Sequence, residues 1–267
     1  MGFSRTPATV LLLALNVLIF IAQELLVAGG AARTAAWFGL NLPDLFGGQY
    51  WRLLTHQFIH GNLLHLLFNM MALWFAGGAV ESAIGTRRFV LIYFIAGIVG
   101  GLTQMAFNLQ PPFVDLIGAS GAVCGILMTF CTLFPSAEIT ALIFFVIPVR
   151  LRARTLGIGI VIASILFWLS GIDDNIGHLA HLGGFLVGFL GGLWCRKDAQ
   201  YPGLARPRQM PPPLPPEYVQ LRPEYAAFDR VLDKISREGF TALSAEERRL
   251  LDEGRERFLR DTKRSKP

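Results

Sequence analysis

Charged residues are scarce in most of this chain: positions 1–195 carry only eight Lys or Arg and seven Asp or Glu. The remaining part, 196–267, holds sixteen basic and twelve acidic side chains. Hydrophobic residues make up 53% of the chain, and the mean hydropathy is +0.48. This composition is too apolar for an ordinary water-soluble domain and indicates membrane spans. We therefore expect the two parts to lie in different solvents.

Cysteine is also scarce, and the sequence lacks the motifs of metal-dependent and of aspartate-dependent hydrolysis. Cys124, Cys131 and Cys195 lie in apolar segments without a regular spacing, which argues against a disulfide framework and a zinc site. Neither an HExxH motif nor a pair of membrane aspartates occurs. Histidines are clustered between positions 56 and 65, but carboxylates do not accompany them. We therefore expect neither a metal ion nor a cofactor.

Apolar runs of about 20 residues, the length that a membrane-spanning helix needs, occur six times. The predicted spans are 8–28, 61–80, 89–108, 116–134, 153–170 and 177–195. A shorter apolar stretch, Ile139–Val149, contains Pro148 and is expected to be a buried or interfacial segment. The first run also resembles a signal peptide, because Arg5 precedes it, but it is long enough to span the membrane and other spans follow. We interpret it as a retained helix.

The charges give these spans an orientation. With the N-terminus in the cytoplasm, most basic residues of the apolar part fall on the cytoplasmic side. These residues are Arg5, Arg87, Arg88, Arg150, Arg152 and Arg154, whereas Arg33 and Arg52 fall outside. The predicted fold class is therefore all-α, a polytopic bundle of six transmembrane helices with both termini cytoplasmic. Topology and lipid head groups explain the net charge of +5, so we expect a membrane lipid partner and no nucleic acid.

Composition also predicts the domain organisation. We expect a membrane domain at 1–195, a Pro-rich linker at 196–223 and a small cytosolic helical tail at 224–267. Within the membrane domain, the long connection 29–60 is rich in aromatic residues and is expected to lie in the outer membrane interface.

Two short helices are expected in the tail. Apolar residues at helical spacing predict the first helix: Phe228, Val231, Leu232 and Ile235. Gly239 suits its end, and Ser244 with Glu247 predicts a capping box that begins the second helix. A solvated and partly disordered tail is the alternative, and its partner is unknown.

Polar side chains inside membrane helices are costly and usually face the bundle interior or a wet cavity. His65 and Asn69 fall in the second predicted span, Ser120 in the fourth and His181 in the sixth. These three spans enter the membrane from the same side. His65, Ser120 and His181 are therefore each expected about four residues into a span, roughly 6 Å along the helix axis. The topology thus predicts these polar groups in one layer near the outer face.

The faces on which Ser120 and His181 lie consist of small residues. They are Cys124 and Cys131 beside Ser120, and Gly184, Gly188 and Gly192 beside His181. Small residues allow helix backbones to approach closely in lipid, and a serine nucleophile needs a base within about 3 Å. His178 could reach the same cavity, but the glycine face lies closer to His181.

Three motifs resemble those of the rhomboid family of intramembrane serine proteases, and the likeness covers about the first 195 residues. The sequence GASG at Gly118–Gly121 resembles the family's GxSG nucleophile motif. The sequence AHLGGFLVG at Ala180–Gly188 resembles the motif that carries the catalytic histidine. The sequence HLLFN at His65–Asn69 resembles the HxxxN element of the second span.

Further residues strengthen the likeness. Trp51 and Arg52 resemble the WR pair of the family's first loop, and His60 also has a counterpart. Glu81 followed by Gly85 resembles the ExxxG turn that closes the second span.

The resemblance implies a Ser–His dyad, with Ser120 as nucleophile and His181 as general base. The backbone N–H of Ser120 and the side chains of His65 and Asn69 would hold the oxyanion. The supporting residues would be Gly118, Gly121, His60, Trp51 and Arg52. The implied substrates are single-span membrane proteins cut near the outer membrane face, and we expect a multi-pass protein of the bacterial inner (plasma) membrane.

One position departs from the family pattern. Some members have an aromatic residue four positions after the serine, where it packs on the catalytic imidazole, but this chain has Cys124 there. The imidazole of His181 is therefore expected to find its support elsewhere. Two other functions are alternatives: a catalytically inactive rhomboid-like protein that binds membrane helices, and a channel or transporter.

Overall fold

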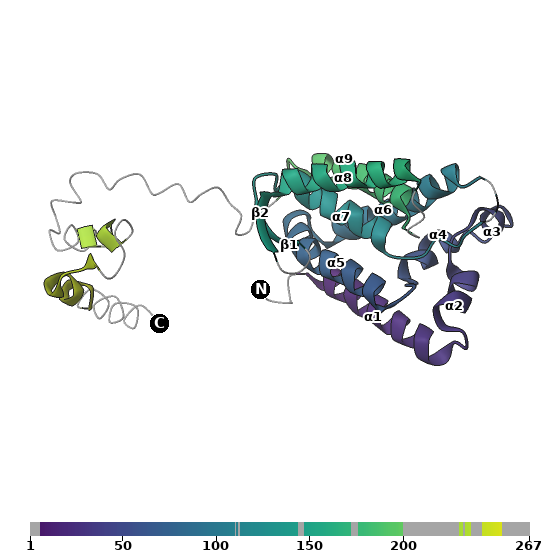
Figure 1. Cartoon of the computed structure of the whole chain (residues 1–267), viewed down its shortest axis with the longest axis horizontal. Helices are drawn as coiled ribbons and strands as arrows, with labels where there is room; N and C mark the ends of the chain where they lie inside the picture. The colour runs from purple at the N-terminus through teal and green to yellow at the C-terminus, as the bar shows by residue number, and fades with distance from the viewer. Residues whose placement is uncertain are drawn as a thin grey trace. The chain divides into compact units, whose positions relative to one another are not determined.

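The computed structural model describes residues 6–109, 111, 113–143, 147–171 and 176–199, and in the tail residues 230, 231, 233–235 and 242–252. The chain divides into two compact units, Met1–Ala205 and Arg206–Pro267. Helices make up most of the described part of the first unit (Figure 1). The predicted fold class, a polytopic helical bundle, is thus confirmed.

Five helices of the first unit are long and apolar enough to cross a membrane. They are α1 (Pro7–Leu26), α5 (Leu63–Ile84), α6 (Thr86–Phe107), α8 (Ala153–Ser170) and α9 (His178–Cys195). Another apolar helix, α7 (Ser120–Leu133), lies in the fourth predicted span but has only 14 residues. It is about 21 Å long, which is less than the thickness of the hydrocarbon core. Figure 1 shows α7 in the middle of the unit, between α8 and α9 on one side and α5 on the other.

The connection between α1 and α5 folds into short helices. They are α2 (Gly30–Phe38), α3 (Leu42–Phe46), α4 (Arg52–Thr55) and the 3₁₀ helix η2 (His56–Phe58). Arg52 ties them together, although it is 97% buried: its guanidinium donates to the carbonyl oxygens of Gly39 and Ala36 and pairs with Asp44 at 3.0 Å. A buried cation with several acceptors fixes its surroundings strongly.

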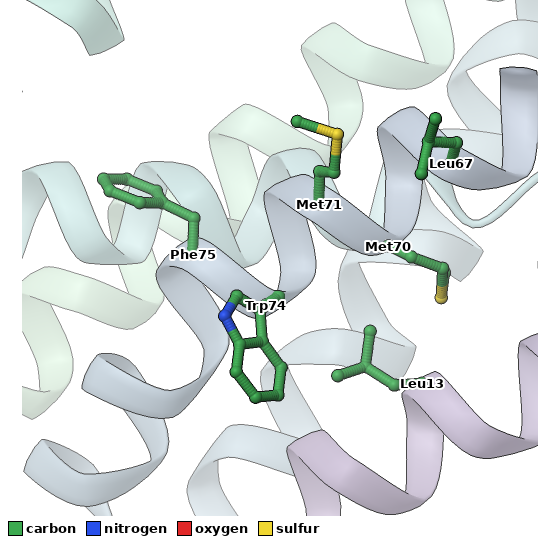
Figure 2. A pocket seen from close by; sticks show the side chains of 6 residues that line it. All are labelled: Leu13, Leu67, Met70, Met71, Trp74 and Phe75. Atoms are coloured by element: carbon green, nitrogen blue, oxygen red, sulfur yellow. The ribbon is translucent and has the colours of Figure 1, made fainter. Parts of the chain in front are cut away.

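The helices α1 and α5 are joined at one end by Glu81, whose side chain is buried. Its carboxylate accepts hydrogen bonds from the backbone N–H groups of Ala8 and Thr9 at 3.0 and 2.8 Å, and from the hydroxyls of Thr9 and Thr86 at 2.7 and 2.8 Å. Negative charge is favourable at a helix N-terminus, where backbone N–H groups lack partners. Gly85, at a φ of +82°, then reverses the chain into α6. Further along the two helices lies an apolar pocket of about 470 Å³, which is lined by Leu13 of α1 and by residues of α5 between Leu67 and Phe75 (Figure 2).

The segment after α7 forms strands, which the sequence did not predict. Ile139–Val149 was expected to be a buried or interfacial apolar stretch, and it lies in an antiparallel hairpin of β1 (Glu138–Ile143) and β2 (Ile147–Arg152). Apolar and polar residues alternate in part of each strand, which is the period of a half-buried strand. Pro148 is compatible with the hairpin because each strand of a two-stranded sheet has a free edge.

In the second unit, short helical segments occur at 230–235, with residue 232 outside the described residues, and at 245–252. The hydroxyl of Ser244 accepts from the N–H of Glu247 at 3.2 Å, and the Glu247 carboxylate accepts from the N–H of Ser244 at 2.7 Å. The predicted capping box is therefore confirmed. Lys234 pairs with Glu247 at 3.0 Å and joins the two segments. Phe228, Leu232, Gly239 and most of the predicted linker lie outside the described residues.

Candidate active site

Ser120 is the first residue of α7 rather than a residue inside a longer span. The expected depth of four residues is therefore wrong, because the chain before Ser120 is not helical. Gly118 has a φ of +117°, which lies in the left-handed region, so a right-handed helix cannot continue through this residue. Its N–H donates to the carbonyl oxygen of His56 at 2.9 Å, and Leu116 pairs with Leu40 through two backbone hydrogen bonds. Ser120 thus stands at a helix N-terminus that the loop holds in place.

The helices α7 and α9 are in backbone contact along a row of glycines. A Cβ atom at Gly184 would overlap the carbonyl oxygen of Gly121, and one at Gly188 would overlap that of Gly125. The hydroxyl of Thr129 donates to the carbonyl oxygens of Gly125 and Gly188 at 2.9 and 3.0 Å. Close packing of the two helices through small residues is therefore confirmed.

The row of α7 residues that faces α9 is not the predicted one. We expected Cys124 and Cys131 to line that face with Ser120, but Gly121 and Gly125 do so. Cys131 instead lies against Gly157 of α8, where an added Cβ would be 3.3 Å from its sulfur. Helical spacing groups residues on a face, but it does not say which neighbour that face will meet.

The contact places the backbones next to Ser120 and His181 side by side. A Cβ at Gly121 would lie 3.4 Å from the carbonyl oxygen of Ala180. Ser120 directly precedes Gly121, and His181 directly follows Ala180. Both side chains therefore start from adjoining stretches of backbone, at the N-terminal ends of two neighbouring helices.

The helix α6 forms the floor of this region. Gly100 lies against the carbonyl oxygen of Ala180, where an added Cβ would be at 2.5 Å. The side-chain oxygen of Gln104 accepts from the N–H of Ala180 at 3.3 Å. A glycine and a glutamine in the third predicted span therefore fix the first turn of α9. Gln104 was not among the predicted site residues, although a glutamine inside a membrane helix is itself a signal.

His65 lies directly against Gly118. A Cβ at Gly118 would be 2.6 Å from Nε2 of His65. The N–H of Gly61 donates to Nδ1 of the same ring at 3.5 Å, so a neutral His65 carries its hydrogen on Nε2, the nitrogen beside Gly118. Asn69 is buried one turn further along α5, and its side-chain N–H donates to the carbonyl oxygen of His65 at 3.0 Å.

His60 and His56 support this region from the loop. The ring of the fully buried His60 lies edge-on to that of His65, with centroids 5.0 Å apart, and both backbone groups of His60 bond to Gln23 of α1. The ring of His56 donates through Nδ1 to the carbonyl oxygen of Arg52 at 2.7 Å. Burial lowers the pKa of His56 to about 4, and burial together with a smaller effect of the neighbouring His65 lowers the pKa of His60 to about 4. Both rings are therefore neutral at pH 7.

The first turn of α9 carries a chain of aromatic contacts. The rings of His178 and His181 meet edge to face, with centroids 6.0 Å apart and planes at 84°. His178 also stacks on Phe167 of α8, with centroids 5.5 Å apart and planes at 9°. The sequence offered no signal for Phe167, because one more aromatic residue in an apolar helix is unremarkable. His178, the predicted rival of His181, thus lies between that residue and α8.

Of the WR pair predicted to support the site, Arg52 acts on the loop itself, since its side-chain bonds among the described residues reach residues 36, 39, 44 and 49. Trp51 is 53% exposed. Among the residues that the structure describes, no three His, Cys, Asp or Glu side chains are grouped so that they could hold a metal ion.

Comparison with known proteins gives one family. The model of the rhomboid domain matches residues 47–198. The rhomboid protease GluP of Bacillus subtilis is 35% identical over 188 residues, which cover 68% of this chain and 33% of GluP. The rhomboid proteases GlpG of Yersinia enterocolitica and Salmonella newport are each 28% identical, over 72% and 68% of this chain and 64% and 60% of their own lengths. The chain therefore spans between one third and just under two thirds of these curated relatives.

Proposed function

The chain belongs to the rhomboid family, and on that premise we propose that it is an intramembrane serine endopeptidase with Ser120 as nucleophile and His181 as general base. The protein is a multi-pass integral membrane protein with bacterial relatives. We place the reaction near the outer membrane face and the protein in the bacterial inner membrane, following the positive-inside orientation.

The observation that carries this proposal is the backbone contact between α7 and α9 beside both residues. A serine hydroxyl reaches only a short distance, so its base must stand on a helix that approaches within backbone contact. The contacts of Gly184 with Gly121, and of Ala180 with Gly121, provide such an approach at the residues adjoining Ser120 and His181. Larger side chains at these positions would push the two helices apart.

The proposed reaction is a two-step acyl transfer. His181 takes the hydroxyl proton as the Ser120 oxygen attacks the scissile carbonyl carbon, and it then gives that proton to the leaving amine. The C–N bond breaks and an acyl-enzyme ester remains. In the second step His181 takes a proton from water, the hydroxide attacks the ester, and the proton returns to Ser120 as the acid product leaves.

The oxyanion of each tetrahedral intermediate needs fixed N–H donors. The first backbone N–H groups of α7, starting at Ser120, lack partners within the helix and carry its positive dipole. His65 offers the Nε2–H beside Gly118, and Asn69 has a second side-chain hydrogen besides the one it gives to His65. Such donors are worth most where water is scarce.

Support for the His181 imidazole is proposed to come from His178 and Phe167. Cys124, which takes the position of the family's aromatic residue, is half-buried and offers no ring. The edge-to-face contact with His178, itself stacked on Phe167, supplies an aromatic wall from α8 instead.

The proposed substrates are single-span membrane proteins. A helical substrate has all its backbone N–H and C=O groups paired, so a protease must unwind it before a peptide bond can reach Ser120. Small or helix-breaking residues near the outer end of the substrate helix lower the free energy of that unwinding. We therefore expect cleavage in such a sequence.

The test is cleavage of a panel of single-span proteins by the purified full chain in proteoliposomes, followed by mass spectrometry of the fragments. We expect internal cleavage near the outer ends of the substrate helices, and its loss in Ser120→Ala and in His181→Ala. Ser164→Ala is the matched control, because Ser164 is a buried membrane serine on α8, and it should cleave like the wild type. Undiminished cleavage by Ser120→Ala would disprove the proposal, and binding of substrate helices without cleavage by the wild type would favour a non-catalytic role.

A further inference from the structure

A groove of about 690 Å³ opens between α7, α8 and α9, on the opposite side of α7 from the pocket in Figure 2. Its floor is α7, including Met128 and Cys131, and its walls are apolar side chains of α8 and α9. Two arginines, Arg154 and Arg196, complete the lining. Most of the groove lining is thus apolar, and its two positive charges are those of Arg154 and Arg196.

The groove exists because α8 touches the bundle at few points. The buried residues of α8 are Ala153, Gly157 and Ser164, and Gly157 is the point where the helix meets Cys131. Between Gly157 and Ser164 the side chains of Ile158 and Ile162 line the groove without being covered. The side chains of Ile158 and Ile162 therefore form a wall of the groove that no other described residue covers.

The opposite wall is a continuous apolar row on α9. Leu182, Leu186, Phe189 and Leu193 follow helical spacing and line the groove together. Leu182 and Leu193 are eleven residues apart, roughly 16 Å along the helix. A lipid acyl chain is a long, narrow apolar group that matches this length and shape.

Both arginines lie at the same end of the groove. Arg154 is in the first turn of α8, and Arg196 directly follows the last residue of α9. These helices pack against each other as neighbours in sequence and run in opposite directions, so the start of one lies beside the end of the other. The charge pattern predicts that this end is cytoplasmic.

The two guanidinium groups have no acidic partner among the described residues. Asp198, two residues after Arg196, is engaged elsewhere, because it pairs with Arg88 at 2.9 Å. Arg154 and Arg196 are both exposed. Two unpaired guanidinium groups at the mouth of an apolar groove are complementary to a phosphate that carries an acyl chain.

We propose that this groove binds an anionic phospholipid. Its phosphate lies between Arg154 and Arg196, and one acyl chain runs along the α9 row from Leu193 towards Leu182. Basic pockets between transmembrane helices on the cytoplasmic side suit anionic head groups, and the arginine stems extend the apolar wall up to the charge. The site does not depend on the protease chemistry.

The test is native mass spectrometry of the purified full chain in a neutral detergent, titrated with phosphatidylglycerol, with phosphatidylcholine of the same acyl chains, and with glycerol phosphate. We expect one phosphatidylglycerol to bind tightly, roughly tenfold more tightly than phosphatidylcholine, and glycerol phosphate not to bind. Equal binding of the two lipids would overturn the charge part of the proposal. Equal binding of glycerol phosphate would show a free-anion site instead.

Two pairs of variants locate the site. The double variant Arg154→Gln with Arg196→Gln should lose the preference for phosphatidylglycerol, whereas Arg87→Gln should keep it. Arg87 is the control because it is exposed at the same end, beside the Arg88 that lies over Trp194 at 5.4 Å, and does not line the groove.

Ile162→Trp should fill the groove and weaken binding of the lipid, whereas Leu166→Trp, one turn further along α8 and outside the groove, should not. An equal effect within either pair would refute the assignment.

A measurement on the unaltered chain covers the case in which a variant fails to fold. Phosphatidylglycerol with a photoreactive acyl chain should crosslink to the α9 row between Leu182 and Leu193. Crosslinks spread evenly over the outer faces of α1 and α5, or confined to them, would contradict the proposal.

Discussion

At the scale of single residues, the candidate site depends on Gly118. This residue combines a left-handed backbone conformation with direct contact to the ring of His65. The GxSG pattern predicted a glycine at this position, and the structure gives two physical reasons. Any other residue would be strained at this backbone conformation, and its Cβ atom would overlap the imidazole of His65. The role of each neighbouring residue in catalysis remains a prediction.

Replacement of Gly118 by alanine should impair activity more than folding. The backbone strain at a φ of +117° is about 1–3 kcal/mol, and the new methyl group displaces His65 from the position where its Nε2–H would meet the oxyanion. We expect kcat to fall by at least about tenfold, since one oxyanion donor is worth that much or more. Gly61→Ala is the control, because its methyl group would lie 3.9 Å from the same ring in ordinary contact. Equal kcat values for the two variants would argue against this role of His65.

His178 should act as a positioning residue for His181. Its loss in His178→Ala removes the ring between His181 and Phe167, so kcat should fall several-fold while KM changes little. His178→Phe keeps a ring at this position and should recover most of the lost kcat. Cleavage kinetics with one substrate give both constants. A change confined to KM, or no recovery by phenylalanine, would speak against positioning.

At the scale of helices, hydropathy predicted where helices occur but not how each begins. All six predicted spans contain a helix, yet α7 begins at Ser120 because Gly118 leaves the helical region and because Leu116 pairs with Leu40. Neither event is visible in a count of apolar residues. Hydropathy does not predict the hairpin of β1 and β2, because its apolar stretch is too short to span a membrane and apolar and polar residues alternate in only part of each strand.

The close approach of α7 and α9 should not tolerate a methyl group at Gly188. An added Cβ would overlap the carbonyl oxygen of Gly125, which is backbone and cannot rotate away. Gly188→Ala should therefore lower the free energy of unfolding by about 1–3 kcal/mol or more. Gly159→Ala in α8 is the matched control: its methyl group meets open space, so it should leave stability unchanged or raise it by up to about 1 kcal/mol. Thermal unfolding in detergent micelles measures both, and equal melting temperatures would contradict the packing described here.

At the scale of the whole molecule, the membrane unit buries two neutral histidines in the loop between α4 and α5. His56 and His60 belong to no ion pair among the described residues, and burial lowers the pKa of each to about 4. The sequence predicted a histidine near the site at position 60, but not its full burial, which depends on the packing of this loop on α1 and α6.

These histidines make stability depend on pH. In the unfolded chain their pKa is near 6.5, so below that pH the unfolded state binds protons that the folded state does not. Stability is fully present above pH 6.5 and is lost as the pH falls towards 4, by up to about 3 kcal/mol for each histidine. Melting temperatures between pH 7.5 and 4.5 should show this loss, and His60→Asn should show a shallower slope. An identical slope in the variant would mean that other groups cause the dependence.

The proposed function depends on Ser120 acting as a nucleophile that His181 activates at the meeting point of α7 and α9. Reaction of the purified chain with a fluorophosphonate in lipid, followed by mass spectrometry of the labelled peptide, tests it directly. We expect one label per chain on Ser120, no label in Ser120→Ala, and labelling slowed by at least about a hundredfold in His181→Ala. A label on another serine, or labelling of His181→Ala at the rate of the wild type, would contradict it.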